Sequence, residues 1–331
     1  MKPKTIANCT RSLVKGGAKN GIRLGARGIH EFRTAKISFG NSVGSCEAVL
    51  LPGTRVFAQA SAAIGEPSDS RPGEGAFTIS VWVSPAATGE MVGSSEKPSA
   101  IARTLERMFK ENRAVDLESL CIKFGELAWI LRVDVHVIEM NGCLQDTAAL
   151  AVLGALLTFQ RPQAEIDVNT DELVVLPLAE CTPVELHLFH LPAVMSFALC
   201  DEILLAEPCQ EEEDILPGKL LVGINDSKEL CHLHLTHPIE QELLLEATKL
   251  AQAQCLDRLN MLKGLVEEVK TQREVPIYKR PQGPRATGTV LSLSALETSS
   301  RNRSEKKPSI KYLSPLITAS DINMLEELCI L

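Results

Sequence analysis

Hydrophobic and polar residues alternate over the first part of the chain, which is the pattern of antiparallel strands. Between residues 35 and 60 the alternating runs are short, and Gly40-Asn41, Gly44 and Pro52-Gly53 separate them. These residue types favour tight turns between neighbouring strands. A loop rich in proline, serine and glycine follows, and a further run at residues 76–83 predicts another strand.

Residues 98–114 show the period of an amphipathic helix. Its apolar residues are spaced to form one stripe along the helix: Ile101, Leu105, Met108 and Phe109. Four basic residues lie away from that stripe or at the end of the helix: Arg103, Arg107, Lys110 and Arg113. We expect Arg113 to close the helix, because a cation there interacts favourably with the helix dipole.

The next segment predicts a long strand followed by a buried helix. Residues 129–138 alternate, with valines on one face and polar residues on the other: Val133, Val135 and Val137 against Arg132, Asp134 and His136. We expect Asp146 to cap a helix at Thr147–Phe159. Alanine and leucine on all sides of that helix predict that it is buried.

The second half of the chain repeats this order of strands and helix. Strands are predicted near residues 173–178, 184–190, 193–206 and 219–236, and a long amphipathic helix near residues 239–270. Two successive strand-then-helix units indicate an α/β (α+β) fold of two similar sandwiches packed together.

This periodicity divides the chain into four parts. We expect a basic N-terminal arm at residues 1–33, one domain at residues 34–165 and a second at residues 166–270. Residues 271–331 are rich in proline, serine, glycine and basic residues, which predicts a flexible tail. Its last part, residues 322–331, regains apolar character and could form a short docking helix.

Charge and cysteine content narrow the function classes. The formal net charge is −8, yet residues 1–33 carry eight Lys or Arg against one Glu, and residues 271–313 carry nine against three. Polyanions could therefore bind at local patches, without an overall positive field. The ten cysteines include no CxxC, so reduced thiols are favoured. No apolar run has the length of a membrane span, so no membrane partner is expected.

Six short segments occur in an order and spacing found in one known family. They are Ile37–Gly40, Gly53–Val56, Arg71–Gly75, Asp116–Cys121, Arg132–His136 and Arg161-Pro162. Together they resemble the RNase PH family, and within it the ring subunits of the eukaryotic RNA exosome. The resemblance covers roughly residues 5–270, and the Asp-x-Glu-Ser-Leu-Cys segment is typical of one type of ring subunit.

The resemblance implies two βαβ-type domains, and it implies partners. These are other RNase PH-like subunits that close a six-membered ring, RNA-binding cap subunits, an associated nuclease and single-stranded RNA. It also implies localisation in the nucleus and nucleolus, and in the cytoplasm.

In active members of that family a Gly-Ser/Thr-Arg turn at the start of the buried helix binds phosphate through amides, a hydroxyl and a guanidinium. The corresponding turn here contains Gly142, Cys143, Leu144 and Gln145. The hydroxyl and the arginine are absent, so a phosphate would lack a positive partner. We therefore expect a degenerate phosphate turn and no catalytic residue.

Active members also carry two aspartates six residues apart in the second domain. Counting back from Leu191-Pro192, these positions fall near Leu178 and Val184. Glu180 and Glu185 lie nearby, and a gap in the alignment could bring one of them into line. Solvated carboxylates at strand ends are the simpler interpretation.

The basic helix face at Arg103, Arg107, Lys110 and Arg113 can hold phosphates without catalysing a reaction. The resemblance implies that such residues line the RNA channel of the ring. The alternative is a solvated helix face with intrahelical pairs such as Glu106–Lys110.

Other groupings of reactive residues give weaker evidence for a function. Strand alternation separates His232 and His234 from Cys231 and His237, so we expect no metal site. There is no phosphate-binding GxxxxGK[ST] motif and no nucleophile elbow, so no cofactor is expected. Gly25-Ala26-Arg27 departs from the family's Asp-Gly-Arg, which puts a local salt bridge in doubt.

The sequence therefore favours a non-catalytic subunit of the exosome ring that supports 3′→5′ RNA processing. An active, phosphate-dependent 3′→5′ exoribonuclease is the competing hypothesis. A third is an organellar RNA-processing protein, because the N-terminus is poor in acidic residues and bears arginines, as transit peptides do.

Overall fold

The computed structural model describes residues 6–23, 25, 27–40, 42–88, 96–166, 173–176, 182–200, 203–216, 218–273 and 290–291. Its first sheet has the spatial order β1 (Ala35–Phe39), β2 (Ser45–Leu50), β3 (Thr54–Gly65), β6 (Leu127–Glu139) and β4 (Ala76–Val83). The short β5 (Cys121–Lys123) also pairs with β6. The pairs from β1 to β6 are antiparallel, which confirms the predicted meander, and β4 runs parallel to β6.

The second sheet has the order β12 (Ile203–Ala206), β11 (Ala193–Cys200), β13 (Gly218–Ile224) and β14 (Leu230–Leu235), all antiparallel. The single strands predicted at residues 193–206 and 219–236 were wrong, because each range holds a pair of strands. In the second pair the chain reverses at Asn225. Its N–H donates to the Glu229 carbonyl, and its own carbonyl accepts the N–H of Lys228.

Smaller strand groups complete the fold. β7 (Gln160–Arg161) pairs with β10 (Val184–Glu185), and β9 (Leu173–Val175) lies between β8 (Ala164–Ile166) and β15 (Val290–Leu291). The strands predicted at residues 173–178 and 184–190 are thus shorter than expected.

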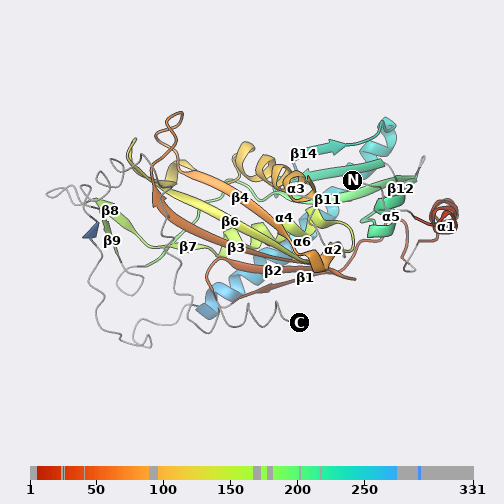
Figure 1. Ribbon diagram of the computed structural model, residues 1–331, viewed down its shortest axis with the longest axis horizontal. Helices are drawn as coiled ribbons and strands as arrows, with labels where there is room; N and C mark the ends of the chain where they lie inside the picture. Colours follow the sequence, from red (N-terminus) through yellow and green to blue (C-terminus); the bar gives the residue numbers. More distant parts are fainter. Residues whose placement is uncertain are drawn as a thin grey trace.

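The helices are α1 (Asn8–Lys19), α2 (Pro85–Thr88), α3 (Glu96–Glu106), α4 (Leu144–Thr158), α5 (Gln210–Ile215) and α6 (Gln241–Arg273). A π-helical turn at Arg107–Glu111 continues α3, and a 3₁₀ turn covers Glu118–Leu120. α4 lies between the two sheets, against β2 and β3 on one side and β11 on the other (Figure 1). This position explains why α4 is apolar all round, as predicted.

The hydrophobic core runs through both sheets and the helices between and beside them. Val133, Val135 and Val137 of β6 are at most 1% exposed, whereas Arg132 and Asp134 on the opposite face form an ion pair with an N–O distance of 2.8 Å. α6 buries a stripe against the second sheet: Ala247, Ala251, Cys255, Leu259 and Leu262. Both predicted faces are therefore confirmed.

Some predictions fall outside the described residues. Leu178, Glu180 and the docking segment at residues 322–331 are among them, as is nearly all of the tail at residues 271–331. Among the helices that the structure describes, none is long and apolar enough to span a membrane.

Candidate functional site

The turn at Gly142 links β6 to α4 and fits closely against the second sheet. Gly142 has φ +78°, and a Cβ there would lie 2.4 Å from the carbonyl oxygen of Pro208, so only glycine fits. The hydroxyl of Thr54 donates to the Gly142 carbonyl at 2.9 Å and accepts the N–H of Asn141 at 3.1 Å. The backbone of the turn is therefore fixed by contacts within the protein.

The first amide at the start of α4 is already bonded to a carboxylate of this chain. The N–H of Cys143 donates to Oε1 of Glu213 at 2.8 Å, and Lys219 Nζ lies 2.5 Å from Oε2 of the same carboxylate. A helix N-terminus attracts anions. Here Glu213 supplies the anion, so this amide is not free for a phosphate.

The other residues of the predicted degenerate turn offer little to a phosphate. Leu144 packs partly into the core, and Gln145 is half-buried. Cys143 is 1% exposed, and burial raises the pKa of its thiol well above the usual value. The thiol donates to the Pro208 carbonyl at 3.2 Å, so it is a protonated, structural group and not a nucleophile.

The expectation that Asp146 caps α4 was wrong. The helix begins at Leu144, and Asp146 lies fully buried in its first turn. Its carboxylate accepts the backbone N–H of Ser196 at 2.8 Å and also bonds the Ser196 hydroxyl, so it ties α4 to β11. Burial, aided by the charge of Glu207, raises the pKa of Asp146 to about 7.

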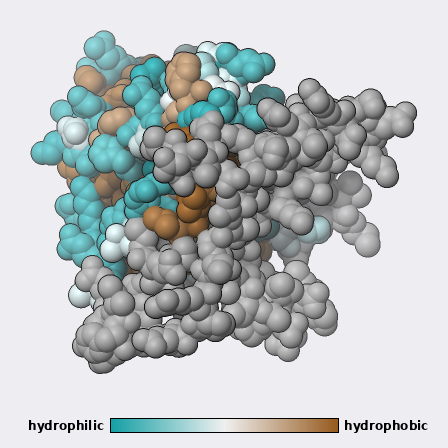
Figure 2. Space-filling model, turned by 90° about the vertical axis from the view of Figure 1, so that its left-hand side faces the viewer, coloured by the Kyte–Doolittle hydropathy of each residue, from teal (hydrophilic) through white to brown (hydrophobic). Residues whose placement is uncertain are grey.

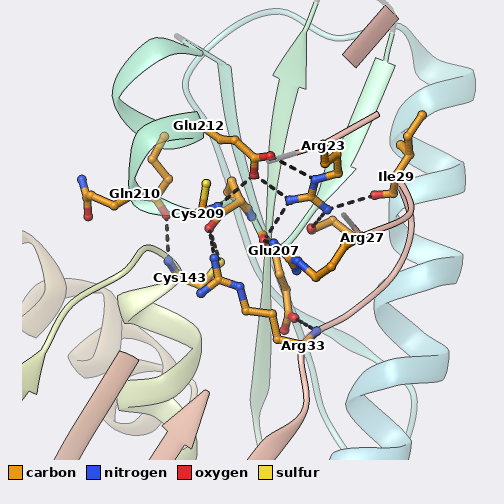
Figure 3. A network of polar contacts seen from close by, with 12 residues as sticks. Arg23, Arg27, Ile29, Arg33, Cys143, Glu207, Cys209, Gln210 and Glu212 are labelled. Atoms are coloured by element: carbon orange, nitrogen blue, oxygen red, sulfur yellow. Dashed lines mark hydrogen bonds and ion pairs between the residues drawn. The ribbon is translucent and has the colours of Figure 1, made fainter. Parts of the chain in front are cut away.

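Several arginines of the predicted basic arm point into the protein and not into solvent. Figure 3 shows Arg23, Arg27 and Arg33 gathered around Glu207 and Glu212. Arg23 is 5% exposed and forms a bidentate pair with Glu212, with N–O distances of 3.1 and 2.7 Å. Burial would raise the pKa of Glu212, but the hydrogen bonds and charge of Arg23 hold it below its ordinary value.

Arg33 joins the Gly142 turn to this network. Its guanidinium donates to the Asn141 carbonyl at 2.8 Å and to the Pro208 carbonyl at 3.0 Å, and its backbone N–H bonds Glu207. Arg258 of α6 pairs with the same carboxylate and also donates to the Arg33 carbonyl at 3.2 Å. The arginine nearest the turn thus serves the packing of the two sheets.

The doubt raised at Gly25-Ala26-Arg27 concerned a local salt bridge. Arg27 donates to the Glu207 carbonyl at 3.2 Å, and the buried salt bridges in this region are made by Arg23 and Arg258 instead. Burial lowers the pKa of Arg27, with the charges of Arg23 and Arg33 acting in the same direction.

Glu185, one of two carboxylates that could have kept a catalytic role, lies far from the turn. It is on β10, which pairs with β7 directly after the C-terminal end of α4, and it contacts Lys270 at 2.6 Å. α4 has 15 residues, so about 20 Å of helix separates Glu185 from Gly142. These two residues cannot act on one phosphate.

The four basic residues of the helix face are all exposed. Arg103, Arg107 and Lys110 project from α3 and its π-helical turn, while Met108 and Phe109 of the same turn are fully buried. Arg113 is also exposed, but it does not close the helix as expected. It follows the turn with φ 53°, a conformation that non-glycine residues seldom adopt.

None of these four residues forms an ion pair with a described carboxylate, and the alternative Glu106–Lys110 pair is not formed. The face is also fixed against the second sheet, because the Asn112 amide donates to the Cys231 carbonyl at 2.6 Å. The structure therefore presents exposed cations on an anchored helix end.

Sequence reasoning missed the carboxylate that occupies the turn, because it comes from α5, far along the chain. Glu213 belongs to the acidic run Glu211–Asp214, and nothing in that run predicts its contact with the amide of Cys143. Within the described part of the chain, no three His, Cys, Asp or Glu residues are placed to hold a metal ion.

The two sheets with α4 between them have counterparts in a known family of proteins. Residues 31–162 match domain 1 and residues 190–254 match domain 2 of the 3′ exoribonuclease family, RNase PH. The chain belongs to this family.

The relatives of this chain indicate a particular branch of the family. Exosome complex component RRP45 of Danio rerio is 33% identical over 280 residues, which cover 83% of this chain and 70% of that protein. The human RRP45 is 30% identical over 83% of this chain and 63% of its own length. That human protein is the polymyositis–scleroderma autoantigen subunit, the subunit type that Asp116–Cys121 predicts.

A solved structure of the Archaeoglobus fulgidus exosome with RNA bound to the active site has the same fold. Its chain aligns with a TM-score of 0.64 at 23% identity, over 79% of this chain and 98% of that one.

Proposed function

We propose that this protein is a non-catalytic subunit of the RNA exosome ring that contacts single-stranded RNA through its basic helix face. The proposal builds on its similarity to exosome components named RRP45. Its partners would be other RNase PH-like ring subunits, RNA-binding cap subunits and an associated nuclease. We place it in the nucleus and nucleolus, and in the cytoplasm; the described cysteines, all free thiols, fit such reducing compartments.

The observation that carries the non-catalytic part is the bond between Glu213 and the Cys143 amide. A phosphate entering this turn would have to displace a carboxylate that Lys219 also holds. Residues Gly142–Gln145 of the turn themselves offer neither a hydroxyl nor a guanidinium, and the two terminal nitrogens of Arg33 already donate to carbonyls. These contacts support loss of phosphorolysis.

The RNA-contact part rests on Arg103, Arg107, Lys110 and Arg113. These exposed cations have no carboxylate partner within the described residues, so the gain from a phosphate contact is not offset by a broken ion pair. Phosphate contacts of this kind give affinity without sequence preference.

The competing hypothesis is an active phosphate-dependent exoribonuclease, and product analysis separates the two. The purified chain is supplied with inorganic phosphate and 3′-labelled RNA, alone and with its ring partners. We expect no nucleoside diphosphate from the chain alone. Its release in amounts proportional to this chain, and lost in a Gly142→Val variant, would refute the non-catalytic function.

A salt titration tests the RNA-contact surface. In the assembled ring, Arg107→Ala and Arg113→Ala should each weaken binding of labelled single-stranded RNA and lower the slope of log K against log salt by about 0.7. Lys15→Ala on α1 is the matched control, because it removes one exposed cation elsewhere. Equal slopes for all three variants and the unmodified ring would contradict the proposal.

A further inference from the structure

We propose that His232 and His234 on β14 extend the RNA-contact surface beyond the basic helix face, so that RNA binding takes up protons at these histidines. The inference rests on the proposed RNA contact of the helix face. It goes further because it adds a second element of the fold and makes affinity depend on pH.

The position of β14 supports this surface. β14 is an edge strand of the second sheet, and it lies beside the π-helical turn that carries Arg107 and Lys110 (Figure 1). The two elements are joined by the bond from Asn112 to the Cys231 carbonyl. Strand alternation places His232 and His234 on one face of β14, about 7 Å apart along the strand.

The surroundings of the two imidazole rings favour an anion. On β13 the residues paired with His232 and His234 are Gly223 and Leu221, which carry no charge. Burial is the largest influence on His232 and lowers its pKa, and the charges of His234 and Arg107 lower it further. The face that these histidines share with Arg107 is therefore positive.

The carboxylates nearby act on another part of the strand. Asp226 and Glu229, in the turn before β14, influence the thiol of Cys231, on the opposite face of the strand. Asp226 is also held by Lys263 at 3.3 Å. On the π-helical turn, Glu111 is exposed and makes no ion pair with Arg107 or Lys110. Within the part of the chain that the structure describes, no carboxylate therefore neutralises the histidine face.

One of the two histidines has a ring nitrogen without a hydrogen-bond partner among the described residues. Nε2 of His232 is shielded from solvent and has no hydrogen-bond partner, although the residue as a whole is half-buried. An unpaired buried nitrogen is unfavourable. His234 is exposed and can approach a ligand directly. A phosphate at this face would therefore contact His234 first, and its oxygen would reach Nε2 of His232 only if that ring turned outward.

The class of ligand follows from the row of donors. Arg103, Arg107 and Lys110 lie along one side of the helix, and the two histidines continue from Arg107 across β14. Such a row suits successive phosphates of one extended nucleic-acid strand better than a single small anion. An opposite charge nearby raises a histidine pKa by about one unit or more. Each unit strengthens binding up to about tenfold once the pH falls below both values.

The test compares affinity at pH 8.0 and pH 6.0 for a fluorescent oligouridylate and the assembled ring. The unmodified ring should bind about tenfold more tightly at pH 6.0. The double variant His232→Gln/His234→Gln should lose most of that gain and keep its affinity at pH 8.0, because glutamine keeps a donor but does not titrate. His30→Gln, an exposed histidine outside this face, is the control and should keep the gain.

The result that would overturn the inference is a double variant with the full pH-dependent gain. A double variant that no longer assembles into the ring would also overturn it, since β14 would then contact a neighbouring subunit. Arg107→Ala separates the two proposals. If it weakens binding while the double variant behaves as the unmodified ring, only the histidine inference fails; if neither matters, the RNA contact itself fails.

Discussion

Asp146 provides the sharpest test of the structure, because a fully buried carboxylate joins α4 to β11. We consider Asp146→Asn, a change that keeps the shape of the side chain. The amide oxygen can still accept the N–H of Ser196, which Asp146 accepts at 2.8 Å. The amide nitrogen can donate to the Ser196 hydroxyl, so the variant removes the charge and keeps the contacts.

The size and sign of the effect follow from the pKa of Asp146. Burial raises it from 3.8 to about 7 in the folded protein. Between these values the folded state holds a proton that the unfolded state has released, so the free energy of unfolding falls as the pH rises. The fall is about 1.4 kcal/mol per pH unit, hence about 3 kcal/mol between pH 5 and pH 7.

The assay is urea unfolding of both proteins at pH 5, 6, 7 and 8. At pH 5 the two should have similar stability, because a protonated carboxyl and an amide are alike. By pH 8 the asparagine variant should be more stable by about 3 kcal/mol. Histidines titrate in the same range, but they cancel in the difference between the two proteins.

Asp226→Asn is the matched control, because Asp226 is a partly exposed carboxylate that bonds Lys263 and the Leu191 N–H. Its pKa is lowered, since these bonds outweigh its burial, so it stays charged throughout and its removal should give a pH-independent change. A constant difference between the Asp146→Asn variant and the unmodified protein from pH 5 to pH 8 would refute the reasoning.

Three further changes probe the turn and the network that holds it. Arg23→Ala leaves Glu212 buried and unpaired, and should lower the free energy of unfolding by about 3–5 kcal/mol; a loss below 1 kcal/mol in urea titration would contradict the buried pair. Glu213→Ala removes the partner of the Cys143 amide and should lower the free energy of unfolding by about 1–2 kcal/mol. This variant should not gain phosphorolysis. The control is Glu211→Ala, which changes an exposed neighbour and should leave the free energy of unfolding unchanged. Gly142→Ala places a Cβ 2.4 Å from the Pro208 carbonyl at positive φ, and should lower the melting temperature by several degrees; an unchanged melting curve would count against the turn geometry.

The layers of the fold could be predicted because periodicity reports on burial directly. The all-apolar composition of α4 predicts a helix covered on every side, and the structure places it between two sheets. Alternation along β6 likewise predicts which residues face the core. The strand pairs at residues 193–206 and 219–236 were merged although polar residues mark both reversals, Asp201-Glu202 and Asn225–Glu229.

The polar interior could not be predicted, because its partners are far apart in the sequence. Asp146 has the residue type and the position of a helix cap, and only the fold shows that Ser196, 50 residues later, takes its carboxylate. The same holds for Arg23 and Glu212, which are 189 residues apart. From the sequence alone, Arg23 is interpreted as a surface charge, whereas in the structure it is buried and holds two distant segments together.

A comparison of the two candidate sites shows why one supports a function and the other does not. A site that binds a ligand must hold donors that the protein itself leaves unsatisfied. At the Gly142 turn, the Cys143 amide is bonded to Glu213 and the two terminal nitrogens of Arg33 donate to carbonyls, so these groups hold the turn in place. On the helix face the cations are exposed and unpaired within the described residues. Packing contacts therefore account for the residues of the turn, whereas the basic face has the role that we propose for it, the binding of a polyanionic partner.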